Sequence, residues 1–111
     1  MSQAIFVQRG ETIDYTAAGA VNAGAVIVLG DLVGVANRAI PANTLGSLMV
    51  EGVFDFVKAT GAGTALAVGT IVYWDVANNR VTSVATGNKL LGKVVMAASD
   101  SDPRVRVRMS Q

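Results

Sequence analysis

The chain has 111 residues, with nine basic and eight acidic side chains for a net charge of +1, and 51% of its residues are hydrophobic. This length fits one domain, and the absence of cysteine and histidine excludes disulfides and removes the commonest general base and transition-metal ligand. The low charge is atypical of duplex-binding domains, and with the apolar content it favours a protein that buries part of its surface in an assembly.

Short β-branched or alternating segments recur along the whole chain, separated by turns rich in glycine, asparagine or aspartate. The segments expected to form strands are 4–8, 12–17, 25–29, 32–36, 45–59, 70–75, 80–85, 90–98 and 104–109. Regular short strands of this kind predict an all-β fold, a small single-domain β-barrel or sandwich over residues 1–111. Charges or glycines interrupt every apolar run before the ~18 residues that a membrane span needs, so no membrane partner is expected.

The first ten residues, "MSQAIFVQRG", contain Phe6 and have two interpretations. Residues 1–10 could be an N-terminal arm that adds a strand to a neighbouring molecule's sheet through main-chain hydrogen bonds. They could equally be an ordinary edge strand of the chain's own barrel, and the pattern favours neither.

A weak internal repeat suggests two similar β-halves. Residues 17–29 align with 62–74 at a shift of 45, which places Gly24 on Gly69. Residues 45–52 align with 91–98 at a shift of 46. Two such halves would pack as a pseudo-symmetric barrel, although a sequence rich in alanine, glycine and valine also aligns by chance.

The segment "LMVEGVFDFVK" (48–58) carries an alternating core stripe and two acidic residues on the opposite face. The stripe is Leu48, Val50, Gly52, Phe54 and Phe56, ending at Lys58. Glu51 and Asp55 are four residues apart, about 13 Å along an extended strand, which exceeds the spacing of paired catalytic carboxylates. We therefore expect them to lie on a solvated or partner-facing surface.

Other motifs for chemistry are incomplete. The glycines of "GAGTALAVG" (61–69) lack the Gly-Lys-Ser/Thr of a phosphate-binding loop, so no nucleotide cofactor is expected. "SDSD" (99–102) lacks the glycine and closing glutamate of an EF-hand and is read as a turn before Pro103. No catalytic residue, metal ligand or small-molecule substrate is assigned.

Arg104, Arg106 and Arg108 alternate with apolar residues in "RVRVRM", which places the three guanidinium groups on one face of a strand. This stripe has three readings: a solvated edge whose charge prevents aggregation, a contact for an acidic protein, or a contact for nucleic acid. Tyr73 and Trp74 point to opposite faces, so at least one is expected in the core. A base-stacking platform needs several aromatic residues on one face, and this chain has too few to favour one.

Several strings, taken in order, resemble the small capsid cement, or head decoration, proteins of tailed bacteriophages. They are "FVQRGETIDYTA", "LVGVANRAI", "VEGVFDFVKATGAG", "YWD…VT…ATG", "LLGKVV" and the terminal "VRVRM". Such proteins have sometimes been labelled RecA-like phage recombinases, but the missing phosphate-binding loop argues against that label here. The resemblance implies a β-barrel that oligomerises, with a trimer favoured over a dimer, and that carries no catalytic residues.

The resemblance also implies the partner and the location. Such a protein is made in the bacterial host cytoplasm and binds the outside of an assembled capsid, where it holds major capsid protein subunits together. The residues expected at the capsid or oligomer interface are Phe6, Glu51, Asp55, Trp74, Arg104, Arg106 and Arg108. The alternatives are a nucleic-acid-binding β-barrel that uses the arginine stripe and a small enzyme that works with aspartate, glutamate and lysine alone.

Overall fold

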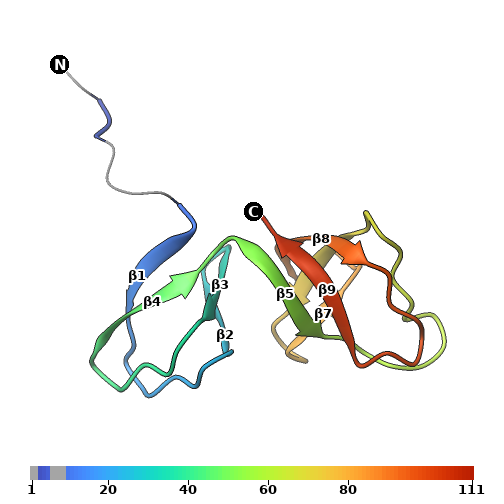
Figure 1. Ribbon diagram of the computed structural model, residues 1–111, viewed down its shortest axis with the longest axis horizontal. Helices are drawn as coiled ribbons and strands as arrows, with labels where there is room; N and C mark the ends of the chain where they lie inside the picture. The colour runs from blue at the N-terminus through green and yellow to red at the C-terminus, as the bar shows by residue number, and fades with distance from the viewer. Residues whose placement is uncertain (1–2, 6–9) are drawn as a thin grey trace.

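The structure is a computed structural model that describes residues 3–5 and 10–111, and the described part of the chain contains β-strands and no helix. Its strands are β1 Thr12–Thr16, β2 Val26–Leu29, β3 Leu32–Ala36, β4 Leu45–Met49, β5 Gly52–Val57, β6 Ile71–Asp75, β7 Arg80–Thr82, β8 Lys89–Met96 and β9 Arg104–Met109. They form two antiparallel sheets, one in an N-terminal lobe (residues 10–50) and one in a C-terminal lobe (residues 51–111), side by side in Figure 1. The predicted all-β fold of short strands is confirmed, in its two-sheet form.

The N-terminal sheet has the strand order β1-β4-β3-β2. Leu29 pairs with Leu32, so β2 and β3 are joined by a two-residue turn in which Gly30 takes a φ of 61°. Glycine is suited to this position because it has no Cβ to oppose a positive φ.

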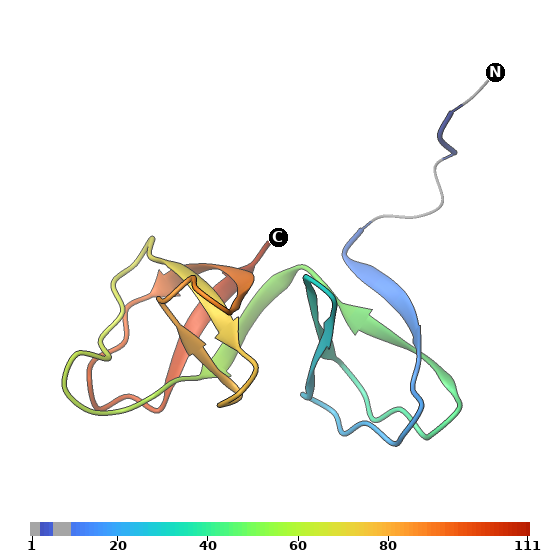
Figure 2. The ribbon, with the colours of Figure 1, turned by 180° about the vertical axis from the view of Figure 1, so that it is seen from behind.

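The C-terminal sheet has the order β5-β9-β8-β6-β7 and is strongly curled. β5 and β9 lie nearest the viewer in Figure 1, whereas β6 and β7 lie nearest the viewer in Figure 2, which shows the opposite side of the molecule. A single parallel bridge between Lys58 and Val81 brings the two edges of this sheet together. The curl encloses an apolar interior lined by alternate residues of each strand.

The segment predicted as one strand over 45–59 is instead two strands in different sheets. β4 ends at Met49, and β5 begins at Gly52, which has a φ of 143°. The intervening Val50 and Glu51 carry the chain from the first sheet to the second. Alternation of apolar and polar residues continues across this break, so the pattern alone does not reveal it.

The main core is shared by the two lobes. It contains buried residues of all five C-terminal strands together with Val33 and Val35 of β3. The carboxamide of Gln111 links the lobes further, because its Nε2 donates to the Val33 carbonyl at 2.6 Å and its Oε1 accepts from the Val33 amide at 2.7 Å. A smaller core of Ala17, Ala36, Ile40 and Leu48 lies within the N-terminal lobe.

The two sheets have the same connectivity. In the first sheet β1 pairs with β4, β4 with β3, and β3 with β2. In the second sheet β5 pairs with β9, β9 with β8, and β8 with β6 in the same way, and β7 is an additional strand at the edge. In the N-terminal lobe, Val21 and Ile40 exchange two backbone hydrogen bonds of 2.8 Å. In the C-terminal lobe, Leu66 and Ala98 exchange two of 2.9 Å.

These equivalences support one of the two sequence alignments and reject the other. The shift of 45 aligns Gly24 with Gly69, and their φ angles are similar, 84° and 89°. The Gly24 amide donates to the Ala36 carbonyl of β3 at 2.7 Å, and the Gly69 amide donates to the Val94 carbonyl of β8, the equivalent strand, at 2.8 Å. The shift of 46 is wrong, because it matches β4 with β8. By connectivity β4 corresponds to β9, and β8 corresponds to β3.

Candidate functional site

The outer face of the C-terminal sheet presents the three arginines of β9. Burial along this strand alternates strictly, with Arg104, Arg106 and Arg108 exposed and the residues between them buried. The register places these arginines opposite exposed residues of β5, in the pairs Val57–Arg104, Asp55–Arg106 and Val53–Arg108. The strand alternation read from the sequence is therefore confirmed, and it places Asp55 among the arginines.

Asp55 and Arg106 form a two-point ion pair. Arg106 Nε donates to Asp55 Oδ1 at 2.9 Å and its Nη2 donates to Oδ2 at 3.3 Å. The Arg106 hydrogen bond lowers the pKa of the Asp55 carboxyl from its ordinary value, and Asp55 in turn raises the pKa of Arg106. Both side chains are about half exposed, so water screens the pair and it orients the two groups more than it stabilises the fold.

A fourth cation belongs to the same face. Lys93 of β8 is the direct cross-strand neighbour of Arg108, and on its other side it pairs with the exposed Ile71 of β6. We call Lys93, Arg104, Arg106 and Arg108, with Asp55, the cationic face. Sequence reasoning missed Lys93, although a lone lysine in the apolar "LLGKVVM" next to a terminal arginine strand was an available signal.

The other residues expected at an interface do not lie on the cationic face. Trp74 is only 5% exposed and packs in the core, while Tyr73 is half-buried, so the expectation that one of the two is buried is confirmed. Glu51 is exposed at the junction of the lobes, beside Gln111. Phe6 lies outside the described residues. The structure thus brings Asp55 and the three arginines together on one face, whereas Glu51 lies apart from them. Trp74 is not on this face, but it lines the same cleft as Asp55 and Arg104.

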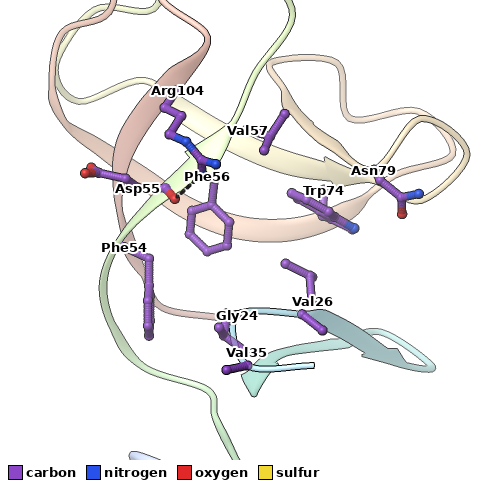
Figure 3. A pocket seen from close by; sticks show the side chains of 12 residues that line it. Gly24, Val26, Val35, Phe54, Asp55, Phe56, Val57, Trp74, Asn79 and Arg104 are labelled. Carbon is purple, nitrogen blue, oxygen red and sulfur yellow. Dashed lines mark hydrogen bonds between the residues drawn. The ribbon is translucent and has the colours of Figure 1, made fainter. Parts of the chain in front are cut away.

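A cleft of about 600 Å³ lies between the lobes. Figure 3 shows aromatic side chains on its C-terminal side facing Val26 and Val35 of the N-terminal lobe. The Phe56 ring centroid lies 5.8 Å from that of Phe54 and 5.9 Å from that of Trp74. These walls suit an apolar side chain.

The polar groups of the cleft do not form an acid–base pair. Its lining has one carboxylate, that of Asp55, which is already paired with Arg106. Arg104 and Asn79 complete the polar lining, and Arg104 donates to the backbone carbonyl of Asp55 at 3.5 Å. Glu51 does not line the cleft, so the two carboxylates of this segment do not meet there.

The aspartates of the 99–102 turn have structural roles. Asp100 Oδ1 accepts hydrogen bonds from the amides of Thr64 at 3.1 Å and Ala65 at 2.8 Å. Asp102 Oδ2 accepts from the Ser99 amide at 2.8 Å. Over residues 3–5 and 10–111, no three histidine, cysteine or acidic residues gather as metal ligands would. The same residues include no helix with the length and apolarity to span a membrane.

Comparison with known families identifies the chain. A family model described as "Phage cement protein" matches residues 7–109. The chain belongs to the phage cement protein family. The resemblance noted in the sequence is therefore confirmed, whereas no curated protein and no solved structure was found to be similar. Membership of this family implies a structural role on the capsid and a virion location, and the family is not a known enzyme family.

Proposed function

We propose that this protein binds the outer surface of the assembled head and stabilises contacts between major capsid protein subunits. The observation that carries the proposal is the family match, because it spans residues 7–109 and so includes every strand of the fold. The protein is made in the bacterial host cytoplasm and joins the shell from outside.

The mechanism is linkage between binding and assembly. A ligand that binds only the assembled lattice stabilises it by RT ln(1 + [L]/Kd), about 2.7 kcal/mol per site at a concentration of 100 Kd. The cationic face and the apolar residues beside it supply the contacts for such binding. The chain needs no reaction chemistry for this work, and the paired state of Asp55 is compatible with a purely adhesive role.

Self-association strengthens the same effect. An oligomer, with a trimer favoured over a dimer, presents several identical contacts and gains from their effective concentration. The N-terminal segment is the candidate for reaching a neighbour, since residues 3–5 lie away from both lobes and Ile5 is 83% exposed. Phe6 is included in this proposed arm by its sequence position alone.

The test is to add purified protein to heads that lack it and to measure both binding and the temperature of head disruption. Binding should be saturable, and the disruption temperature should rise with occupancy. An unrelated small β-protein at the same concentration serves as the control and should leave the temperature unchanged. Native mass spectrometry should show a multiple of 11.4 kDa, with three copies favoured. Saturated binding without any rise in temperature would reject the stabilising mechanism.

Nucleic-acid binding is the alternative use of the arginine stripe, and two observations disfavour it. Arg106 is engaged by Asp55, and Trp74 is buried, so the described face lacks an exposed indole for base stacking. A salt-sensitive complex with duplex DNA that is lost when the three arginines become alanine would favour this alternative instead.

A further inference from the structure

The cationic face has an internal imbalance at the pair Lys93–Arg108. The two residues are direct cross-strand partners, and both side chains are exposed. Like charges directly opposite each other destabilise a sheet. Arg106 has Asp55 as its counter-ion, whereas Lys93 and Arg108 form no ion pair with any residue of 3–5 or 10–111. A repulsive pair with no internal anion is suited to receive one from a partner.

The close approach of these two residues is built into the strands. A Cβ added to Gly92 would collide with the carbonyl oxygen of Arg108, so only glycine allows β8 and β9 to pack this closely at that point. In this register Gly92 pairs with Met109, and the adjacent pair is Lys93 with Arg108. The side chains are therefore held as neighbours by the backbone.

A hollow lies beside the pair. It has a volume of about 460 Å³ and is lined by Lys93, Arg108, Val68 and Val95, together with backbone at Gly69 and Gly92. Val68 is 64% exposed and Val95 is 42% exposed. Cations next to exposed aliphatic walls match a carboxylate carried on an apolar stem or flanked by apolar residues.

The distribution of charge over the molecule points the same way. The cationic face carries four of the nine basic side chains and one of the eight acidic ones, which leaves five basic and seven acidic side chains for the rest of the chain. Positive potential is thus concentrated on one sheet face. Phosphates would leave the neighbouring Val53, Val68 and Ile71 without apolar contacts, whereas an acidic protein surface supplies carboxylates and apolar groups together.

We propose that the hollow at Lys93 and Arg108 is the docking site for an acidic segment of the capsid protein, with a carboxylate seated between the two cations and an apolar neighbour against Val68 and Val95. This inference rests on the proposed function and adds to it the face and the chemistry of the contact. Arg-carboxylate hydrogen bonds would fix the orientation, and the cations would speed association at low salt.

The experiment measures binding to heads that lack the protein, by co-sedimentation over a salt series. The wild type is compared with the double variant Lys93→Gln/Arg108→Gln and with a matched control, Arg38→Gln/Arg80→Gln. The control loses the same two charges at exposed positions outside the cationic face. The double variant should bind at least about tenfold more weakly than the wild type and with a smaller salt dependence, whereas the control should stay within about twofold.

Thermal unfolding separates a docking role from a structural one. Because the double variant removes a repulsive pair, it should unfold at the same temperature as the wild type or higher. A large drop would show that Lys93 and Arg108 are needed for the fold and would overturn the inference. The same conclusion would follow if the double variant bound heads as tightly as the wild type.

Two further outcomes would also overturn it by naming another occupant. If the double variant has a lower native mass than the wild type but binds heads equally well, the face contacts a second copy of the chain. If the wild type binds a duplex DNA fragment in a salt-sensitive way and the double variant does not, while both bind heads equally well, the face contacts nucleic acid. If the wild type does not bind heads at all, the proposed function fails and this inference fails with it, whereas normal wild-type binding with an unimpaired double variant rejects this inference alone.

Discussion

Replacing Lys58 by methionine tests the one buried charged side chain among residues 3–5 and 10–111. Lys58 follows β5 and is only 4% exposed. Its ammonium donates to the carbonyls of Ala59 at 2.8 Å and Asp102 at 2.9 Å, and more weakly to Thr64 Oγ1 at 3.4 Å. It therefore ties the loop after β5 to the loop before β9, at the point where the parallel bridge joins the edges of the C-terminal sheet.

The expected loss follows from these contacts. A hydrogen bond from a charged donor contributes about 1.5–3 kcal/mol, and methionine keeps the buried stem of Lys58 but removes both short bonds. Allowing for water that reaches the freed carbonyls, we expect a loss of about 3–5 kcal/mol. At about 4 °C per kcal/mol for a chain of this size, the midpoint of thermal unfolding should fall by about 12–20 °C.

The assay is thermal unfolding followed by circular dichroism, with Lys89→Met as the matched control. Lys89 also forms a short contact, 2.8 Å to Asp31, but the carboxylate is 98% exposed, so this replacement should shift the midpoint by only a few degrees. If Lys58→Met shifts the midpoint no more than the control does, the ammonium does not hold the two loops together and the reasoning is wrong.

Two more predictions concern the cationic face and the strands beneath it. In NMR titrations the pKa of the Asp55 carboxyl should lie below 3.8 and should return toward that value in Arg106→Gln. The contribution of the ion pair to stability is therefore present above about pH 3.8 and is lost as the pH falls through the lowered pKa. An unchanged Asp55 pKa in the variant would contradict this. Gly92→Ala should destabilise the fold by at least about 3 kcal/mol in urea unfolding, because its Cβ would meet the Arg108 carbonyl. Gly19→Ala, which meets nothing within 4 Å, should be close to neutral, and equal effects of the two alanines would refute the packing argument.

Local patterns in the sequence predicted most individual strands. The alternation of "RVRVRM" gave both the bounds of β9 and the face of its arginines, because a strand's period of two residues leaves no other way to bury three apolar side chains. Likewise 32–36 coincides with β3. The residues expected as a strand at 4–8 are only partly described, and Ala4 and Ile5 do not form one.

The pairing of distant strands could not be predicted in the same way. β5 pairs with β9 across about fifty residues, and no local signal specifies that partner. The division into two sheets depends on the backbone conformation at Gly52, which the continuous alternation through Glu51 conceals. The candidate site shows the same limit: its arginines were visible in one strand, whereas the role of Lys93 required knowing that β8 lies beside β9.

The repeated connectivity has a consequence for translation. Every pairing partner of β1 to β4 lies between Thr12 and Met49, so the complete first sheet emerges from the ribosome before the strands of the second sheet do. The β3 valines of the shared core become buried only after the remaining half of the polypeptide has emerged. Synthesis from the N-terminus thus presents the halves in the order in which each can close, and joining them is left for last.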